Sequence, residues 1–170
     1  YMNAGAYGGE MKNVVKTVTY LEDGEIYTKS IDELDFGYRK TYFTGKQCVI
    51  LSCTIECVRK NEADIRAEMD DYASRRRDKQ PLEYPSAGSF FKRPEGHFAG
   101  KLIQDAGLRG ASVGGAEVSE KHAGFIINTG GATCRDIVSL AELVIKTVYD
   151  KFGVRLHPEV RTLGFEFKGE

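Results

Sequence analysis

A serine lies among glycine, phenylalanine and cationic residues in the segment from Pro85 to Pro94, PSAGSFFKRP. A serine hydroxyl can donate a proton to a developing carbanion if neighbouring hydrogen bonds stabilise the alkoxide that remains. Ser89 does not lie in a GxSxG motif, and no Ser-His-Asp pattern accompanies this segment, so the usual arrangement of a nucleophilic serine is not indicated here. By composition the segment is a loop, and proton donation by Ser89 is the chemistry it could perform.

Two further features could bind anions. Arg75 and Lys79 lie four residues apart in a predicted helix, so they share a face and could converge on a diphosphate, although a solvated helix end is the alternative. Glycine pairs could cradle phosphates with backbone N–H groups, but none forms a P-loop or a GxGxxG motif, and tight turns are the alternative. These pairs are Gly8-Gly9, Gly114-Gly115 and Gly130-Gly131.

The elements that would position these residues begin with strands. The run from Val14 to Ser30 contains Asp23-Gly24, a dipeptide typical of tight hairpins. Ser30 and Glu33 form a capping box, but Gly37 limits any helix to about two turns, so Arg39 is expected on a loop. Residues 47–58 predict a strand with one buried face, because apolar side chains recur at every second position. That face comprises Val49, Leu51, Cys53, Ile55 and Cys57.

Three helices are predicted. The first runs from Asn61 to about Lys79 with an apolar stripe, the second from His97 to Ala106, and the third from a Thr133 cap to Phe152. The stripe of the first helix comprises Ile65, Met69, Tyr72 and Ala73. The expected inward residues of the other two are Phe98, Leu102, Ile103, Ile137, Leu140, Val144, Val148 and Phe152. Short glycine-rich strands are expected up to Asn128, and alternation returns between Val154 and Phe167. Without a repeating βαβ unit, the predicted class is α+β.

Charge and composition exclude several classes of protein. With 24 basic and 25 acidic residues, the chain offers no broad cationic surface for nucleic acid. No apolar run reaches the length of a membrane span, so no membrane partner is expected. The four cysteines lack CxxC spacing, so we expect free cysteines packed as small apolar groups and a cytoplasmic location. The three histidines lack metal-site spacing, so we expect them to be structural or surface residues and expect no metal.

Four segments, taken together and in this order, resemble the MurB family of flavin-dependent reductases. They are Met2–Gly9 (MNAGAYGG), Phe36–Arg39 (FGYR), Pro85–Pro94 (PSAGSFFKRP) and Pro158–Arg161 (PEVR). The resemblance extends over essentially the whole chain and favours the shorter subtype of the family. Because Tyr1 precedes Met2 and relatives have a preceding lobe, we expect a C-terminal fragment lacking the N-terminal part of the FAD-binding domain.

The resemblance implies a two-step reaction in peptidoglycan precursor synthesis. NADPH would reduce bound FAD, and the reduced flavin would pass hydride to UDP-N-acetylglucosamine enolpyruvate, giving UDP-N-acetylmuramate. The alternatives are a noncatalytic nucleotide-sugar binding module and an oxidase of the same flavin fold. The fragment itself is expected to be inactive and to bind FAD weakly or not at all. The oligomeric state is not predicted.

The resemblance also assigns roles to residues. Ser89 would donate the proton, and Arg39 and Glu159 would polarise the substrate carboxylate, with Glu159 in a protonated form that can donate a hydrogen bond. The substrate-binding positions are Tyr7, Arg75, Lys79 and Arg93, and the flavin edge would be lined by Asn3, Gly5 and Ala6. Residues 1–79 and 158–170 would form the remainder of the FAD-binding domain, and residues 80–157 an α/β substrate-binding lobe.

Overall fold

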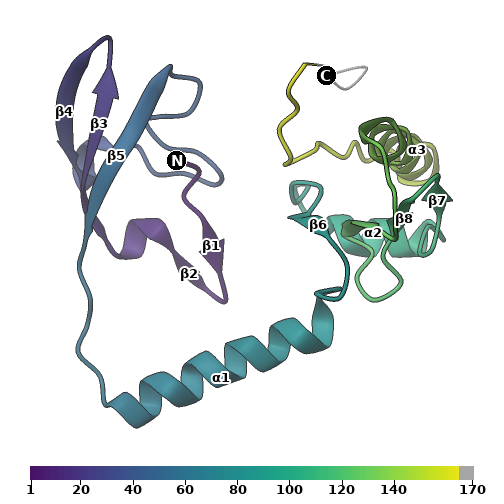
Figure 1. Ribbon diagram of the computed structural model, residues 1–170, viewed down its shortest axis with the longest axis horizontal. Coiled ribbons are helices and arrows are strands. Elements are labelled where there is room, and N and C mark those ends of the chain that lie inside the picture. Colours follow the sequence, from purple (N-terminus) through teal and green to yellow (C-terminus); the bar gives the residue numbers. More distant parts are fainter. Residues whose placement is uncertain (165–170) are drawn as a thin grey trace. The chain divides into compact units, whose positions relative to one another are not determined.

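The hairpin predicted at Asp23-Gly24 forms two strands of a three-stranded antiparallel sheet (Figure 1). The structure is a computed structural model that describes residues 1–164. Strand β3 (Val15–Glu22) pairs with β4 (Glu25–Ser30). Asp23 and Gly24 have φ angles of 52° and 82°, the left-handed values that a two-residue type I′ turn requires. The hairpin prediction is therefore confirmed.

The third strand of this sheet is β5 (Cys48–Ile55), which confirms the predicted strand but not its buried face. The sheet order is β4-β3-β5, so β5 is an edge strand. Val49, Leu51 and Ile55 are 57%, 50% and 50% exposed. Alternation identifies the two faces of a strand, but it does not reveal what covers either of them.

The core of this sheet comes mainly from the central strand. Its buried residues are Val15, Val18, Tyr20, Leu34 and Phe43. The four cysteines are all free, but the expected apolar packing is wrong for three of them. Cys53, Cys57 and Cys134 are exposed, and Cys48 is half-buried.

Helix α1 (Glu62–Lys79) confirms the first predicted helix. Asn61 Oδ1 accepts a hydrogen bond from Ala63 N at 2.8 Å, as expected of a capping residue. None of the helix residues is buried, so the apolar stripe does not enter a core: Met69, for example, is 65% exposed. The chain divides within this helix into two units, Tyr1–Tyr72 and Ala73–Glu170.

Short elements complete the first unit. The strands β1 (Gly5–Ala6) and β2 (Gly9–Glu10) form a small hairpin, and two 3₁₀ helices follow, at Met11–Asn13 and Ile31–Glu33. The capping box at Ser30 is present, with Ser30 N donating to Glu33 Oε2 at 2.9 Å. The helix that it starts is limited to three residues, so Arg39 lies on a loop as predicted.

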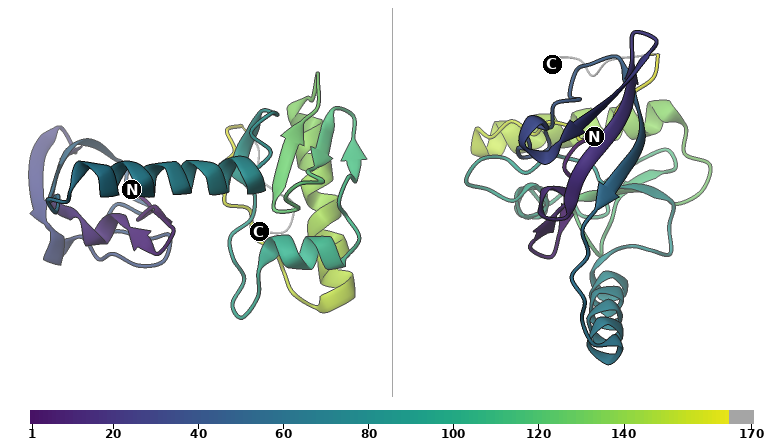
Figure 2. Two further views of the ribbon diagram at one scale, coloured as in Figure 1. Left: turned by 90° about the horizontal axis from the view of Figure 1, so that it is seen from below. Right: turned by 90° about the vertical axis from the view of Figure 1, so that its left-hand side faces the viewer.

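The second unit contains a four-stranded antiparallel sheet of order β6-β9-β8-β7. Its strands are β6 (Ser86–Ser89), β7 (Ser112–Val113), β8 (Ala116–Val118) and β9 (Phe125–Asn128). Figure 2 shows the strands and helices of this unit from two further directions, coloured mostly green to yellow. Helix α3 (Cys134–Phe152) contacts β7 and β8, and α2 (Ala99–Asp105) contacts α3. The segment read as a loop at Pro85–Pro94 thus contains a strand.

Helix α3 has the predicted ends and core face. Thr133 Oγ1 accepts from Asp136 N at 3.2 Å, and Gly153 ends the helix with a φ angle of 66°. Its buried residues are Leu140, Ala141, Val144 and Val148. Phe152, by contrast, is 41% exposed, so its predicted inward position is wrong.

The remaining expectations are met in part. In α2, Leu102 and Ile103 are buried, but Phe98 is 61% exposed. Between residues 154 and 164 the structure has no extended strand, only a single bridge between Pro158 and Phe91, and the end of the predicted alternation lies outside the described residues. The α+β class is confirmed. All strand pairs in the described residues are antiparallel, in the second unit too, where an α/β lobe was expected.

Candidate active site

A pocket of about 260 Å³ in the first unit gathers five of the predicted site residues. Its wall is formed by the β1–β2 hairpin and by the loop that follows Phe36. The site residues among its lining are Asn3, Gly5, Ala6, Tyr7 and Arg39. The structure therefore brings together all three residues expected at the flavin edge, one expected substrate-binding residue and one expected catalytic residue.

Tyr7 lies at the tip of the β1–β2 hairpin. Tyr7 and Gly8 have φ angles of 50° and 84°, so the turn needs left-handed backbone at both central positions. Tyrosine is unusual there because its Cβ crowds the backbone. Its ring stacks on that of Tyr72, with centroids 4.6 Å apart and planes at 10°, and this contact holds the tyrosine at the tip.

Arg39 also occupies a left-handed position, with a φ angle of 53°. It is the third residue of a turn in which Lys40 N donates to Gly37 O at 3.3 Å and Gly37 N donates to Lys40 O at 2.9 Å. A positive φ angle at this position alone is the mark of a type II turn, which normally places glycine there. Strain of this kind concentrates at functional sites. Backbone strain therefore indicates Tyr7 and Arg39 as candidate functional residues, independently of their side-chain chemistry.

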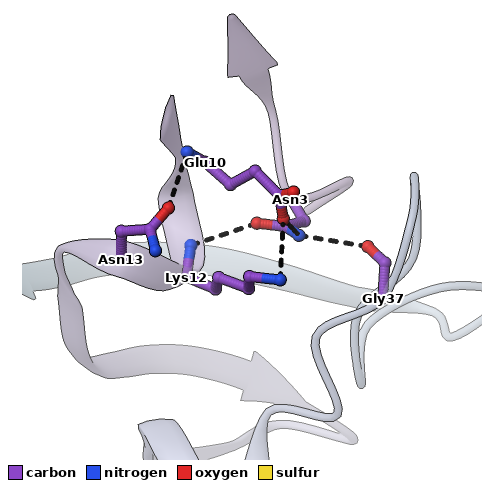
Figure 3. A network of polar contacts seen from close by, with 5 residues as sticks. All are labelled: Asn3, Glu10, Lys12, Asn13 and Gly37. Atoms are coloured by element: carbon purple, nitrogen blue, oxygen red, sulfur yellow. Dashed lines mark hydrogen bonds and ion pairs between the residues drawn. The ribbon is translucent and has the colours of Figure 1, made fainter. Parts of the chain in front are cut away.

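Asn3 is 4% exposed and lies at the centre of a polar network (Figure 3). Its Nδ2 donates to Glu10 Oε2 at 2.7 Å and to Gly37 O at 3.1 Å, and its Oδ1 accepts from Lys12 N at 3.0 Å. The hydrogen bond from Asn3, followed by the contact with Lys12, holds the pKa of Glu10 below its usual value. Glu10 therefore remains an acceptor for the Asn3 amide over most of the pH range.

A second pocket, of about 350 Å³, lies in the second unit beside Ser89. Ser89 is exposed at the end of β6, where it pairs with Phe125 of β9. The next two side chains, Phe90 and Phe91, are each 3% exposed and belong to the core. The GSFF sequence therefore fixes the strand end by burying both rings and leaves the serine hydroxyl at the pocket.

Arg93 lines the same pocket, and two contacts hold its guanidinium group. The group lies over the ring of Phe98, 3.9 Å from its centroid, and Nε donates to His97 O at 3.2 Å. Arginine stacks readily on aromatic faces. This contact explains why Phe98 is exposed rather than inward: its ring supports a cation at the surface.

Glu159 is held beside strand β6 through its backbone, and its role toward the substrate carboxylate stays a prediction. Its backbone N–H donates to Phe90 O at 2.8 Å, which anchors residue 159 next to the Ser89 strand. Arg75 and Lys79 lie on exposed turns of α1, and neither lines the two pockets described. The structure thus places Ser89 and Arg93 in one pocket, while the diphosphate clamp of Arg75 and Lys79 stays a prediction.

His122 is a pocket residue that the sequence did not reveal. It lines the Ser89 pocket, and its Nδ1 accepts from Gly124 N at 3.1 Å, so the neutral ring carries its proton on Nε2. Burial lowers the pKa of His122, and the positive charge of Arg109 lowers it further. A lone histidine without metal-ligand spacing gives no sequence signal, so only the fold could place it here.

Residues 1–164 contain no group of three or more His, Cys, Asp or Glu side chains arranged to hold a metal ion. Within the same range, no helix combines the length and apolarity needed to cross a bilayer.

Comparison with known proteins defines the class. Residues 80–163 match the model of the C-terminal domain of UDP-N-acetylenolpyruvoylglucosamine reductase. Proteins of that name from Clostridium perfringens (strain SM101) and Shouchella clausii are 52% and 54% identical to this chain over 165 residues, 96% of its length. The chain spans about half the length of these curated relatives, 54% and 53% respectively.

A solved structure agrees with this result. The crystal structure of UDP-N-acetylenolpyruvylglucosamine reductase (MurB) from Thermus caldophilus matches with a TM-score of 0.79 and 31% identity, covering 95% of this chain and 58% of that one. Residues 80–163 therefore match a domain of a family of reductases, and nearly the whole chain is similar to members of that family. That family is UDP-N-acetylenolpyruvoylglucosamine reductase, the MurB family, as the four sequence segments predicted.

Proposed function

We propose that this chain carries substrate-binding and catalytic residues of a flavin-dependent reductase that converts UDP-N-acetylglucosamine enolpyruvate to UDP-N-acetylmuramate. This proposal rests on sequence identity. About half of 165 aligned residues are the same in proteins named UDP-N-acetylenolpyruvoylglucosamine reductase. The reductant would be NADPH and the location the cytoplasm, where peptidoglycan precursors are made. A noncatalytic nucleotide-sugar binding module would instead bind the same substrate without oxidising NADPH.

The first pocket fits part of a flavin rather than the whole of FAD. Gly5, Gly8 and Gly9 leave its wall without side chains, so a planar ring could approach the backbone closely. Its volume of about 260 Å³ is below the roughly 300–1,000 Å³ of pockets that bury a drug-sized ligand. The chemistry that bound FAD would supply is hydride transfer, after its reduction by NADPH. We expect this chain alone to bind FAD weakly or not at all.

The chain's own residues would handle the negative charge and the proton. Hydride arriving at the terminal carbon of the enolpyruvyl group leaves carbanion character beside the carboxylate. Arg39 and Glu159 would polarise that carboxylate and so spread the charge. Ser89 would give its hydroxyl proton to the carbon next to the carboxylate, which completes the saturated lactyl group. Tyr7, Arg75, Lys79 and Arg93 would orient the nucleotide sugar.

Replacing Ser89 by Ala tests the proposal in the full-length enzyme. Loss of the proton donor should lower kcat by about 100- to 10,000-fold, the usual contribution of general acid catalysis, and leave substrate affinity unchanged. Turnover would be followed by NADPH absorbance and affinity by calorimetry. Ser112→Ala, on exposed strand β7 of the same sheet, is the matched control and should keep full activity.

The outcomes separate the candidate functions. A wild-type protein that binds the nucleotide sugar but never oxidises NADPH would be a noncatalytic binding module. Undiminished turnover in Ser89→Ala would show that the proton comes from another group, and the assignment of Ser89 would be abandoned.

A further inference from the structure

The turn that carries Arg39 depends on a contact from a distant segment. Gly37 O accepts two hydrogen bonds, one from Lys40 N within the turn and one from Asn3 Nδ2 at 3.1 Å. Arg39 then follows in left-handed backbone. A strained conformation of this kind persists only where surrounding contacts enforce it. The Asn3 contact is one of these, because it fixes the first residue of the turn.

The Asn3 side chain has no amide hydrogen left for a ligand. Both hydrogens of Nδ2 are engaged, by Glu10 Oε2 and by Gly37 O, and Oδ1 accepts from Lys12 N. Glu10 also fixes which way the amide points, since an ionised carboxylate accepts only from the NH₂ end. Figure 3 shows the amide between the hairpin and Gly37. The Asn3 side chain is therefore not available to donate a hydrogen bond to a flavin.

The hairpin is built around the same network. A Cβ at Gly5 would lie 3.0 Å from Glu10 Cγ and 3.0 Å from Gly9 O, so glycine lets the two short strands close tightly. Asn13 Oδ1 accepts from Glu10 N at 2.8 Å and holds the other side of that residue. Glu10 is thereby held where its carboxylate meets Asn3.

We propose that Asn3 is a positioning residue for Arg39, acting through the Gly37 carbonyl with Glu10 as its support, rather than a residue that contacts the flavin. The role of Arg39 in the reaction rests on the proposed function, whereas the positioning rests on the geometry of the first unit alone. In this arrangement Asn3 aligns the guanidinium without touching the substrate.

A double-mutant cycle in the holoenzyme tests the proposal. Asn3→Ala should lower kcat by up to about 100-fold, the effect of misplacing a catalytic group by roughly 1 Å, with little change in KM. If Asn3 acts through Arg39, the same substitution in an Arg39→Ala background should cause no further loss. Flavin affinity and flavin reduction by NADPH should be unchanged. Equal losses in both backgrounds, or weakened flavin binding, would overturn the proposal.

A second measurement does not depend on turnover. In ¹⁵N spectra of this chain, Asn3→Ala should shift the amide resonances of residues 37–40, and Thr28→Ala, exposed on β4 outside this network, should leave them in place. Should Asn3→Ala fail to fold, Asn3→Asp keeps the size and the acceptor for Lys12 N and removes both donors. Unmoved resonances at residues 37–40 would refute the positioning role even in an active enzyme. An inactive wild type with the expected shifts would instead count against the proposed function.

Discussion

Gly124 is limited in size by the side chains that surround it beside the Ser89 pocket. A Cβ at Gly124 would lie 2.9 Å from His122 Cε1 and 3.5 Å from Ser89 Oγ. The same glycine donates its N–H to His122 Nδ1. Gly124 therefore makes room for the imidazole and orients it at the wall of the Ser89 pocket.

Gly124→Ala should destabilise the second unit. The added methyl group must displace the His122 ring and break its hydrogen bond to the backbone, and overpacking of this kind costs about 1–3 kcal/mol. The urea midpoint of unfolding measures the effect. Gly9→Ala, where a Cβ would meet nothing nearer than 3.7 Å, is the control and should change the midpoint little. Equal midpoints for the two variants would contradict this account of the pocket wall.

His122 should make stability depend on pH. Its pKa is lowered by burial from an ordinary 6.5, so the unfolded chain binds the proton more readily than the folded chain. The stability that the neutral His122 ring contributes is fully present above pH 6.5. It is lost as the pH falls through the lowered pKa of the folded state. His122→Asn keeps an acceptor for Gly124 N and does not titrate, so it should lose less thermal stability on acidification. The measurement is the change in Tm of the wild type and the variant as the pH is lowered from above 6.5. Exposed His97→Asn is the control and is expected to follow the wild type.

At the scale of elements, the helix ends are specified locally. Thr133 and Asp136 form a reciprocal capping box, with Thr133 N donating to Asp136 Oδ2 at 2.8 Å and Asp136 N donating to Thr133 Oγ1 at 3.2 Å. Both bonds satisfy N–H groups that a helix leaves unpaired at its start.

Thr133→Ala should therefore cost about 1 kcal/mol of stability, within the usual range of about 0.5–2 kcal/mol for a lost cap. The free energy of unfolding in urea measures this loss. Thr133→Ser retains the hydroxyl and should stay close to wild type. A Ser variant as unstable as the Ala variant would assign the effect to the methyl group of Thr133 instead of the cap.

Elements with local signals could be predicted from the sequence, and contacts between elements could not. The Asp23-Gly24 turn, the Asn61 and Thr133 caps and the α3 core face all depend on neighbouring residues, and the structure contains them. The burial of β5 and of α1 depends on what covers them: the buried face predicted for β5 is wrong, and none of the apolar stripe of α1 is buried. Motif resemblance predicted Ser89 and Arg39 as site residues, whereas the bond from Asn3 to Gly37 and the place of His122 in a pocket depend on how distant segments fold together.

At the scale of the whole molecule, the two units have cores of different size. The second unit packs α2 and α3 against its sheet around residues such as Leu140 and Val144, both fully buried. The first unit has a small cluster centred on Leu34 and Phe43, beside an exposed edge strand. Local opening is governed by buried apolar contacts, so the units should differ in local stability.

Hydrogen exchange should reveal this difference. Amides of α3 between Leu140 and Val148 should exchange slowest, and those of β5 should exchange much faster. Mass spectrometry of peptides from the two regions, sampled over time, gives the comparison. Equal protection of β5 and α3 would indicate that the small first core is as stable as the large second one.

The left-handed backbone at Tyr7 and Arg39 has a consequence for protein engineering. Each such residue costs of order 1–3 kcal/mol, and glycine would relieve much of that cost. Substitutions selected for thermal stability alone would therefore favour glycine at the two positions where the proposed chemistry needs a phenol and a guanidinium. Substitutions selected for the stability of this chain would then inactivate the full-length enzyme, so each one must also be checked for substrate turnover there.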